Sequence, residues 1–124
     1  MVLPRKKYFL QEKADAFAQR IVRMYQYLTI QKNEHIMSKQ VFRSGTSIGT
    51  NIAESKNAQS SQDYINKLNI ALKEADETIY WIKNLYNGGY INEKEYQSIG
   101  QDAEELTKLL VSSVKKVKQR IGKL

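Results

Sequence analysis

Residues 43–54 read Arg43-Ser-Gly-Thr-Ser-Ile-Gly-Thr-Asn-Ile-Ala-Glu54, a run of small and polar side chains where the surrounding pattern predicts a helix. Glycine inside a helix costs about 1 kcal/mol relative to alanine, and Gly45 and Gly49 both lie here. Serine and threonine compete with the helix for backbone hydrogen bonds. A helix that accepts these costs needs close approach of a neighbouring backbone, a fixed polar network, or both.

Apolar periodicity on both sides of this stretch predicts four helices, over about residues 8–31, 34–56, 61–87 and 93–121. In the first, apolar residues alternate at spacings of four and three, as in the buried seam of a bundle helix. These residues are Leu10, Ala14, Phe17, Ile21, Met24 and Leu28. Similar stripes follow in the other three, and no alternating strand pattern of useful length occurs. Short connections then predict one all-α domain over residues 1–124, an antiparallel up-down-up-down four-helix bundle.

Residues with specific backbone preferences predict the helix ends. Asn33 is expected as the N-cap of the second helix, and Ser60 or Ser61 as the N-cap of the third. Glycines 88–89 are expected to end the third helix, because glycine adopts the left-handed conformation that follows many helices. Residues 92–95 have the pattern of a capping box at the start of the fourth.

The amino-acid composition excludes several classes of protein. The chain has no cysteine, so a disulfide framework and thiolate chemistry are excluded. No apolar run approaches the roughly 18 residues that a membrane span requires, and the start of the chain lacks the pattern of a signal peptide. We therefore expect a cytoplasmic protein.

The net charge of +7 is concentrated at the two ends of the chain. Residues 1–7 and 106–124 contain basic residues and no acid, whereas residues 8–105 carry a charge of −2. The terminal cations are Arg5, Lys6, Lys7, Lys108, Lys115, Lys116, Lys118, Arg120 and Lys123. These residues are the candidates for binding nucleic acid. In an antiparallel bundle both ends lie together, so residues 5–7 and 115–123 are expected to form one basic patch. The alternative is that they serve solubility and the charge preference of a helix C-terminus.

The sequence lacks the residue patterns of common catalytic and metal sites. It has one histidine, His35, whereas a di-iron bundle requires two Glu-x-x-His pairs. Spacings typical of zinc sites, phosphate-binding loops and dinucleotide-binding loops are also missing. We expect no enzymatic activity, no catalytic residue, no cofactor and no bound metal.

The stretch at residues 43–54 presents one polar face. The side chains that fall within about 60° of each other around the helix are Arg43, Ser47, Thr50 and Glu54, with Asn51 beside them. Ile48 and Ile52 point toward the core. Arg43 and Glu54 are about 16 Å apart along the axis, so each needs a partner elsewhere. The third helix offers Glu74 and Asp76 for Arg43, and Lys67 or Lys73 for Glu54.

Two interpretations of this polar face remain open. In the structural one, Arg43, Ser47, Ile48, Asn51, Ile52, Glu54 and Glu74 fix the register of helices within the bundle or between subunits. In the functional one, Arg43 and Asn51 bind a ligand or RNA. We favour the structural interpretation, because no catalytic partner lies near these residues in the sequence.

The same stretch, followed by Tyr64-Ile-x-x-Leu68-x-Ile-Ala71-x-x-Glu74, resembles the small bacterial four helix bundle protein family. That family includes proteins encoded in intervening sequences of large-subunit ribosomal RNA genes and the accessory variability protein of diversity-generating retroelements. The resemblance extends from the first helix to about Leu110, with Ser55 at a position where many members have glycine. The resemblance implies that this chain forms a homo-oligomeric ring, and pentamers are known in the family. The retroelement members of the family bind nucleic acid, so the resemblance also implies nucleic-acid binding.

Together these observations lead to a functional hypothesis with one alternative. The hypothesis is a non-enzymatic, oligomeric accessory protein that binds nucleic acid through its basic ends, with a preference for structured RNA. The alternative is a scaffold or adaptor that binds another protein, such as a reverse transcriptase or a ribosomal factor, without contacting nucleic acid itself.

Overall fold

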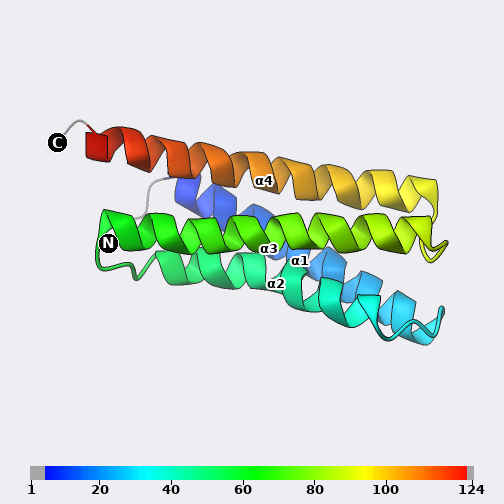
Figure 1. The fold of residues 1–124 in the computed structure, drawn as a ribbon. Coiled ribbons are helices and arrows are strands. Elements are labelled where there is room, and N and C mark those ends of the chain that lie inside the picture. The colour runs from blue at the N-terminus through cyan, green and yellow to red at the C-terminus, as the bar shows by residue number, and fades with distance from the viewer. Residues whose placement is uncertain (1–4, 123–124) are drawn as a thin grey trace.

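Four α-helices make up the described part of the chain, which in this computed structural model spans residues 5–122, with side chains from residue 9 onward. They are α1 (Arg5–Ile30), α2 (Met37–Ser55), α3 (Ser61–Asn87) and α4 (Glu93–Gly122). The helices run alternately in opposite directions (Figure 1), and residues 5–122 contain no strand. The predicted all-α four-helix bundle is confirmed.

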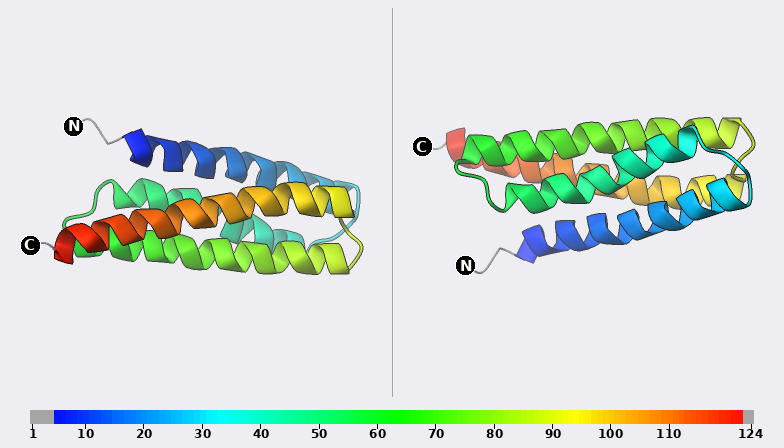
Figure 2. Two further views of the ribbon diagram at one scale, coloured as in Figure 1. Left: turned by 90° about the horizontal axis from the view of Figure 1, so that it is seen from above. Right: turned by 90° about the horizontal axis from the view of Figure 1, so that it is seen from below.

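Neighbouring helices in the sequence pack against each other, and α1 also packs against α4. The contact between α1 and α4 is the sparsest of the four. Figure 2 shows that α1 diverges from α4 toward the end of the bundle where α1 begins and α4 finishes. Two ion pairs bridge this seam, Lys13 to Glu105 at 3.1 Å and Arg20 to Asp102 at 2.6 Å. Because their contact is sparse and the two helices diverge, the side between α1 and α4 is the most open side of the bundle.

The core is a continuous apolar cluster to which all four helices contribute. The predicted seam of α1 lies within it, and only Met24 among its members is partly exposed. From α2, Val41, Ile48 and Ile52 are buried. Ile48 and Ile52 therefore fill core positions, as their place on the helix predicts.

The start of α2 differs from the prediction. We expected Asn33 to cap a helix beginning at residue 34, but α2 begins at Met37 and Asn33 adopts a left-handed φ of 51°. Asparagine tolerates this conformation, so it serves the turn instead of the cap. The cap is the carboxylate of Glu34, which is 6% exposed. It accepts hydrogen bonds from the backbone N–H groups of Ile36, Met37 and Ser38 at 3.1, 3.0 and 2.6 Å.

Replacing Glu34 by alanine is expected to destabilise the protein by about 2 kcal/mol at neutral pH, because three N–H groups lose a charged acceptor. Burial raises the pKa of Glu34, but the three backbone hydrogen bonds outweigh burial, and the net pKa is lowered. A lowered pKa in the folded state means that the stabilisation is complete above about pH 4.3 and is lost as the pH falls through the folded-state pKa.

Urea unfolding of the wild type and Glu34→Ala across this pH range measures the effect. Glu12→Ala is the matched control, because Glu12 is exposed. A difference between wild type and Glu34→Ala that did not shrink in acid would contradict the role of the ionised carboxylate.

The other predicted helix caps are confirmed, whereas α1 begins at Arg5, earlier than the predicted residue 8. Ser60 caps α3, with its Oγ accepting from the backbone N–H of Asp63 at 3.1 Å. The left-handed residue after α3 is Gly89, with a φ of 82°. At the start of α4, Asn92 Oδ1 accepts from the N–H of Glu95 at 2.8 Å, and Glu95 Oε1 accepts from the N–H of Asn92 at 3.1 Å. These reciprocal bonds are the predicted capping box.

Candidate functional site

The glycines of residues 43–54 face α1 at close range. A Cβ atom on Gly45 would lie 2.7 Å from Ile21 Cγ1, and one on Gly49 would lie 3.3 Å from Asp15 Oδ1. Packed carbon atoms prefer separations of about 3.5–4.0 Å. The carbonyl oxygen of Gly49 also accepts a hydrogen bond from Gln11 Nε2 at 3.1 Å. The close helix approach expected for this stretch is therefore present, between α1 and α2.

A buried pair of hydroxyl groups joins the same stretch to α3. Ser44 Oγ and Thr78 Oγ1 lie 2.9 Å apart, and both residues are completely buried. Our reading of the sequence did not single out this pair. Thr78 continues the spacing of the core residues Ala71, Ala75 and Ile82, and that spacing is the signal that could have identified it.

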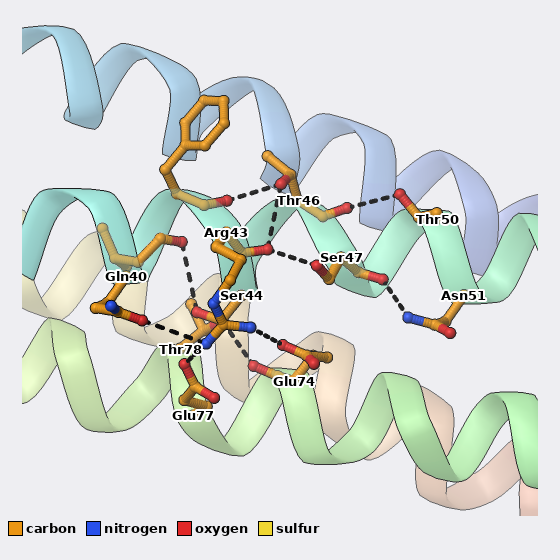
Figure 3. A network of polar contacts seen from close by, with 12 residues as sticks. Gln40, Arg43, Ser44, Thr46, Ser47, Thr50, Asn51, Glu74, Glu77 and Thr78 are labelled. Atoms are coloured by element: carbon orange, nitrogen blue, oxygen red, sulfur yellow. Dashed lines mark hydrogen bonds and ion pairs between the residues drawn. The ribbon is translucent and has the colours of Figure 1, made fainter.

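Arg43 extends from α2 to α3 and contacts two glutamates (Figure 3). Its Nη1 lies 3.3 Å from Glu74 Oε2, and its Nη2 contacts Glu77, which also accepts from Trp81 Nε1 at 3.1 Å. The expected contact with Glu74 is present, whereas Asp76 forms no ion pair among the residues described. The sequence reading missed Glu77, although it lies one turn after Glu74 and shares its helix face.

The remaining polar side chains of the stretch bond mainly to their own helix (Figure 3). Ser47 Oγ donates to the carbonyl of Arg43 at 2.6 Å, and Asn51 Nδ2 donates to the carbonyl of Ser47 at 2.9 Å. Glu54 pairs with Lys67 at 3.1 Å. The polar face is thus linked to α3 at its two ends by exposed ion pairs, each typically worth up to about 1 kcal/mol. Its role in fixing register stays a prediction.

The basic residues predicted to bind nucleic acid lie mainly on the second half of α4. Five of them fall within the described side chains, and none of the five takes part in an ion pair there. They are Lys108, Lys115, Lys116, Lys118 and Arg120. The side chains of Arg5, Lys6 and Lys7, and all of Lys123, lie outside the described residues. The beginning of α1 and the end of α4 do lie at the same end of the bundle (Figures 1 and 2).

Three of these five cations line two different hollows. Lys115 and Lys118 flank an apolar groove of about 480 Å³ between α3 and α4, with Leu72, Val111 and Val114 as its walls. Lys108 precedes Lys115 by two helical turns on the same face. This face of α4 therefore combines an apolar groove with three lysines.

Arg120 instead faces the connection between α2 and α3. Here a polar pocket of about 290 Å³ is lined by Lys56, Ser60, Tyr64 and Arg120, among others. Burial raises the pKa of the Tyr64 hydroxyl, and the nearby Arg120 guanidinium partly offsets this. The sequence reading included Arg120 but missed Lys56, because Lys56 was expected only as the last residue of the second helix. The pocket brings two cations and several hydroxyl groups together, a combination that suits a phosphate group.

His35 lies in the connection between α1 and α2. His35 is exposed, and its Nε2 lies 2.7 Å from Asn33 Oδ1. Within residues 5–122, no three histidine or acidic side chains are grouped as metal ligands would be. No helix in the same range is both long and apolar enough to span a bilayer.

Comparison with known proteins places the chain in a family. The family described as 23S rRNA-intervening sequence protein matches residues 6–112. A similar solved structure is that of a protein of unknown function from the S23 ribosomal protein family of Bacteroides thetaiotaomicron VPI-5482. The two chains are 51% identical, with a TM-score of 0.88 over 89% of this chain and 98% of that one. No match was found among curated proteins. The chain therefore belongs to the 23S rRNA-intervening sequence protein family.

Proposed function

We propose that this chain is a cytoplasmic, non-enzymatic accessory protein that binds nucleic acid, with a preference for structured RNA, through the second half of α4. The observation that carries the proposal is the set of five α4 cations without ion pairs among the described residues. Residues 106–124 contain no acid that could neutralise them. Such a surface favours phosphate, the anion that nucleic acids present in regular rows.

The alternative explanation of these cations, stabilisation of a helix C-terminus, accounts for only part of them. The helix dipole acts within about the last turn of a helix. Lys108 lies about 21 Å from the end of α4 at Gly122, and Lys115 lies about two turns from it. Their positions are better explained by an external anion.

The polar pocket beside Arg120 supports the same function. Arg120 lies on α4 and Lys56 in the α2–α3 connection, and both line the pocket together with hydroxyl groups. A phosphate there would extend the row of contacts from the α4 lysines onto the α2–α3 connection. The family match ends at residue 112, so Lys115, Lys116, Lys118 and Arg120 lie beyond the matched region.

Binding of a 23S ribosomal RNA fragment at two salt concentrations tests this proposal. Because phosphate contacts release counterions, we expect the affinity to fall at least about a hundredfold between roughly 50 and 200 mM salt. Fluorescence anisotropy of a labelled RNA hairpin measures this, with a single-stranded RNA of equal length testing the preference for structure. If no binding occurs at micromolar protein in low salt, the proposal is wrong.

We also propose that the chain forms a homo-oligomer, with the pentameric ring implied by the family resemblance as the expected form. Several large apolar side chains are exposed and could be covered by a second copy of the chain, including Ile30 at 75%, Ile36 at 77% and Tyr80 at 59%. Light scattering after size-exclusion chromatography should give a multiple of 14.4 kDa. A mass equal to one chain would contradict this part of the proposal.

The apolar groove between α3 and α4 supports a second candidate, a protein-binding adaptor. Its apolar walls and its two flanking lysines would suit an amphipathic helix with acidic residues. The variant Val111→Ser distinguishes the nucleic-acid-binding candidate from the adaptor candidate. It removes an apolar side chain from the wall of the groove and keeps every cation. Unchanged RNA affinity in this variant favours the nucleic-acid proposal over the adaptor.

A further inference from the structure

We propose that a hollow between α1 and α4, at the end of the bundle opposite the basic end, binds a nucleotide. The base would lie on the apolar floor of the hollow, and the phosphate would lie between Arg23 and Lys94. Two sources share this chemistry, a free nucleotide and an unpaired nucleotide of a bound RNA. The second source rests on the proposed function, whereas the first does not.

The hollow has the size and lining of a small-ligand site. Its volume is about 470 Å³, within the roughly 300–1,000 Å³ that is typical of such sites. Met24 and Tyr27 from α1, Ile91 from the α3–α4 connection and Ile99 from α4 form the floor. Both isoleucines are 4% exposed, and Met24 and Tyr27 are half-buried. A flat apolar group can therefore pack on a floor made by α1, the α3–α4 connection and α4.

The charged side chains around the hollow fall into two groups. Arg20 is held by Asp102 at 2.6 Å, and Glu95 caps the first turn of its own helix. Arg23 and Lys94 are exposed, come from facing helices, and form no ion pair among the described residues. Two cations that border one hollow repel each other, and an anion between them relieves this repulsion. The charge of the hollow therefore complements an anionic group.

The types of residue favour a nucleotide over a simple anion or a fatty acid. Arginine binds phosphate through two parallel N–H groups, and aromatic rings and guanidinium planes stack on nucleobases. Tyr27 supplies the ring. Lys32, which does not line the hollow, has its Nζ 5.8 Å from the centroid of this ring. An inorganic anion would leave the apolar floor unused, and an aliphatic acid would leave the ring without a stacking partner.

The hollow is far from the basic end, so the two sites can be tested separately. Lys94 and Lys118 are about 36 Å apart along α4. A nucleotide in the hollow therefore cannot contact the cations on the second half of α4. Binding of a mononucleotide, measured without RNA, reports on the hollow alone.

Titration of the full ¹⁵N-labelled chain with adenosine 5′-monophosphate tests the proposal by NMR. We expect shift changes at the amides of Met24, Tyr27, Ile91 and Ile99, with an affinity at least about tenfold higher than that of adenosine or inorganic phosphate. Arg23→Glu should weaken binding about tenfold or more. Lys83→Glu, an exposed lysine on α3 that does not line the hollow, makes the same charge change and should leave binding unchanged.

Three results would overturn the proposal: no shift changes at these amides, equal binding of inorganic phosphate, or nucleotide binding that Arg23→Glu leaves intact. A single-stranded RNA that shifts the same amides identifies RNA as the source, and shifts with the mononucleotide alone identify a free nucleotide. Both of these support the site. Reversing the charge of Lys108, Lys115 and Lys118 should leave the mononucleotide shifts in place, so failure of the RNA proposal and failure of the hollow give different results.

Discussion

Reversing the charge of three exposed lysines of α4 is expected to remove most of the affinity for RNA. Lys108, Lys115 and Lys118 lie within about 80° of each other around the helix, so their side chains share one face. Changing all three to glutamate replaces phosphate-binding cations with anions. We expect the affinity for a 23S ribosomal RNA fragment to fall at least about a hundredfold, and the salt slope to lose about three units. Anisotropy titrations at several salt concentrations measure both quantities.

A variant with the same charge change on other helices tests whether RNA affinity depends on the position of the charges or only on the net charge. Lys39, Lys73 and Lys83 are exposed on α2 and α3 and form no ion pair among the described residues. Changing these three to glutamate alters the net charge equally, and we expect the affinity to fall less than about tenfold. Equal losses in the two variants would mean that binding follows the overall charge, and α4 would lose its assigned role.

Changing Gly45 to alanine is expected to destabilise the fold by about 1–3 kcal/mol, although alanine is the better helix former by about 1 kcal/mol. The added Cβ would lie 2.7 Å from Cγ1 and 3.0 Å from Cγ2 of Ile21. Ile21 is completely buried and branched at Cβ, so it has little freedom to move away. Either α1 or α2 must then shift. Urea unfolding of the wild type and Gly45→Ala gives the difference in free energy.

Gly100 provides the control for this substitution. It lies within α4, and a Cβ atom built there meets nothing within 4 Å. Gly100→Ala should therefore stabilise the protein by about 0.5–1 kcal/mol through helix propensity alone. The same chemical change is thus expected to have opposite signs at the two positions. A stabilising Gly45→Ala would show that α1 and α2 do not need the glycine for their approach.

Apolar periodicity was sufficient to predict the fold. The stripe in the first helix and the glycine and capping signals at residues 88–95 depend on local chemistry, and the structure confirms them. The predicted start of α2 was wrong, because two neighbouring residues can both act as the cap. Both Asn33 and Glu34 can satisfy free N–H groups, and the choice between them depends on the path of the chain after α1, which periodicity does not report.

The candidate site was harder to predict, because its contacts join different helices. The sequence indicated that Arg43 needs a partner on the third helix, but the choice among Glu74, Asp76 and Glu77 depends on how α2 and α3 are rotated. The contribution of Lys56 to the pocket beside Arg120 depends on the α2–α3 connection reaching α4. Sequence reasoning therefore identified the cations and the stretch of small residues, and the structure added their neighbours.

Photo-cross-linking tests most directly the claim that the second half of α4 contacts nucleic acid. The wild-type protein would be bound to a 23S ribosomal RNA fragment containing photoreactive uridines, irradiated, and analysed by mass spectrometry of its peptides. We predict that the cross-linked residues concentrate within residues 108–120 and the neighbouring α2–α3 connection. Cross-links confined to the outer faces of α2 and α3, with none on α4, would contradict the account.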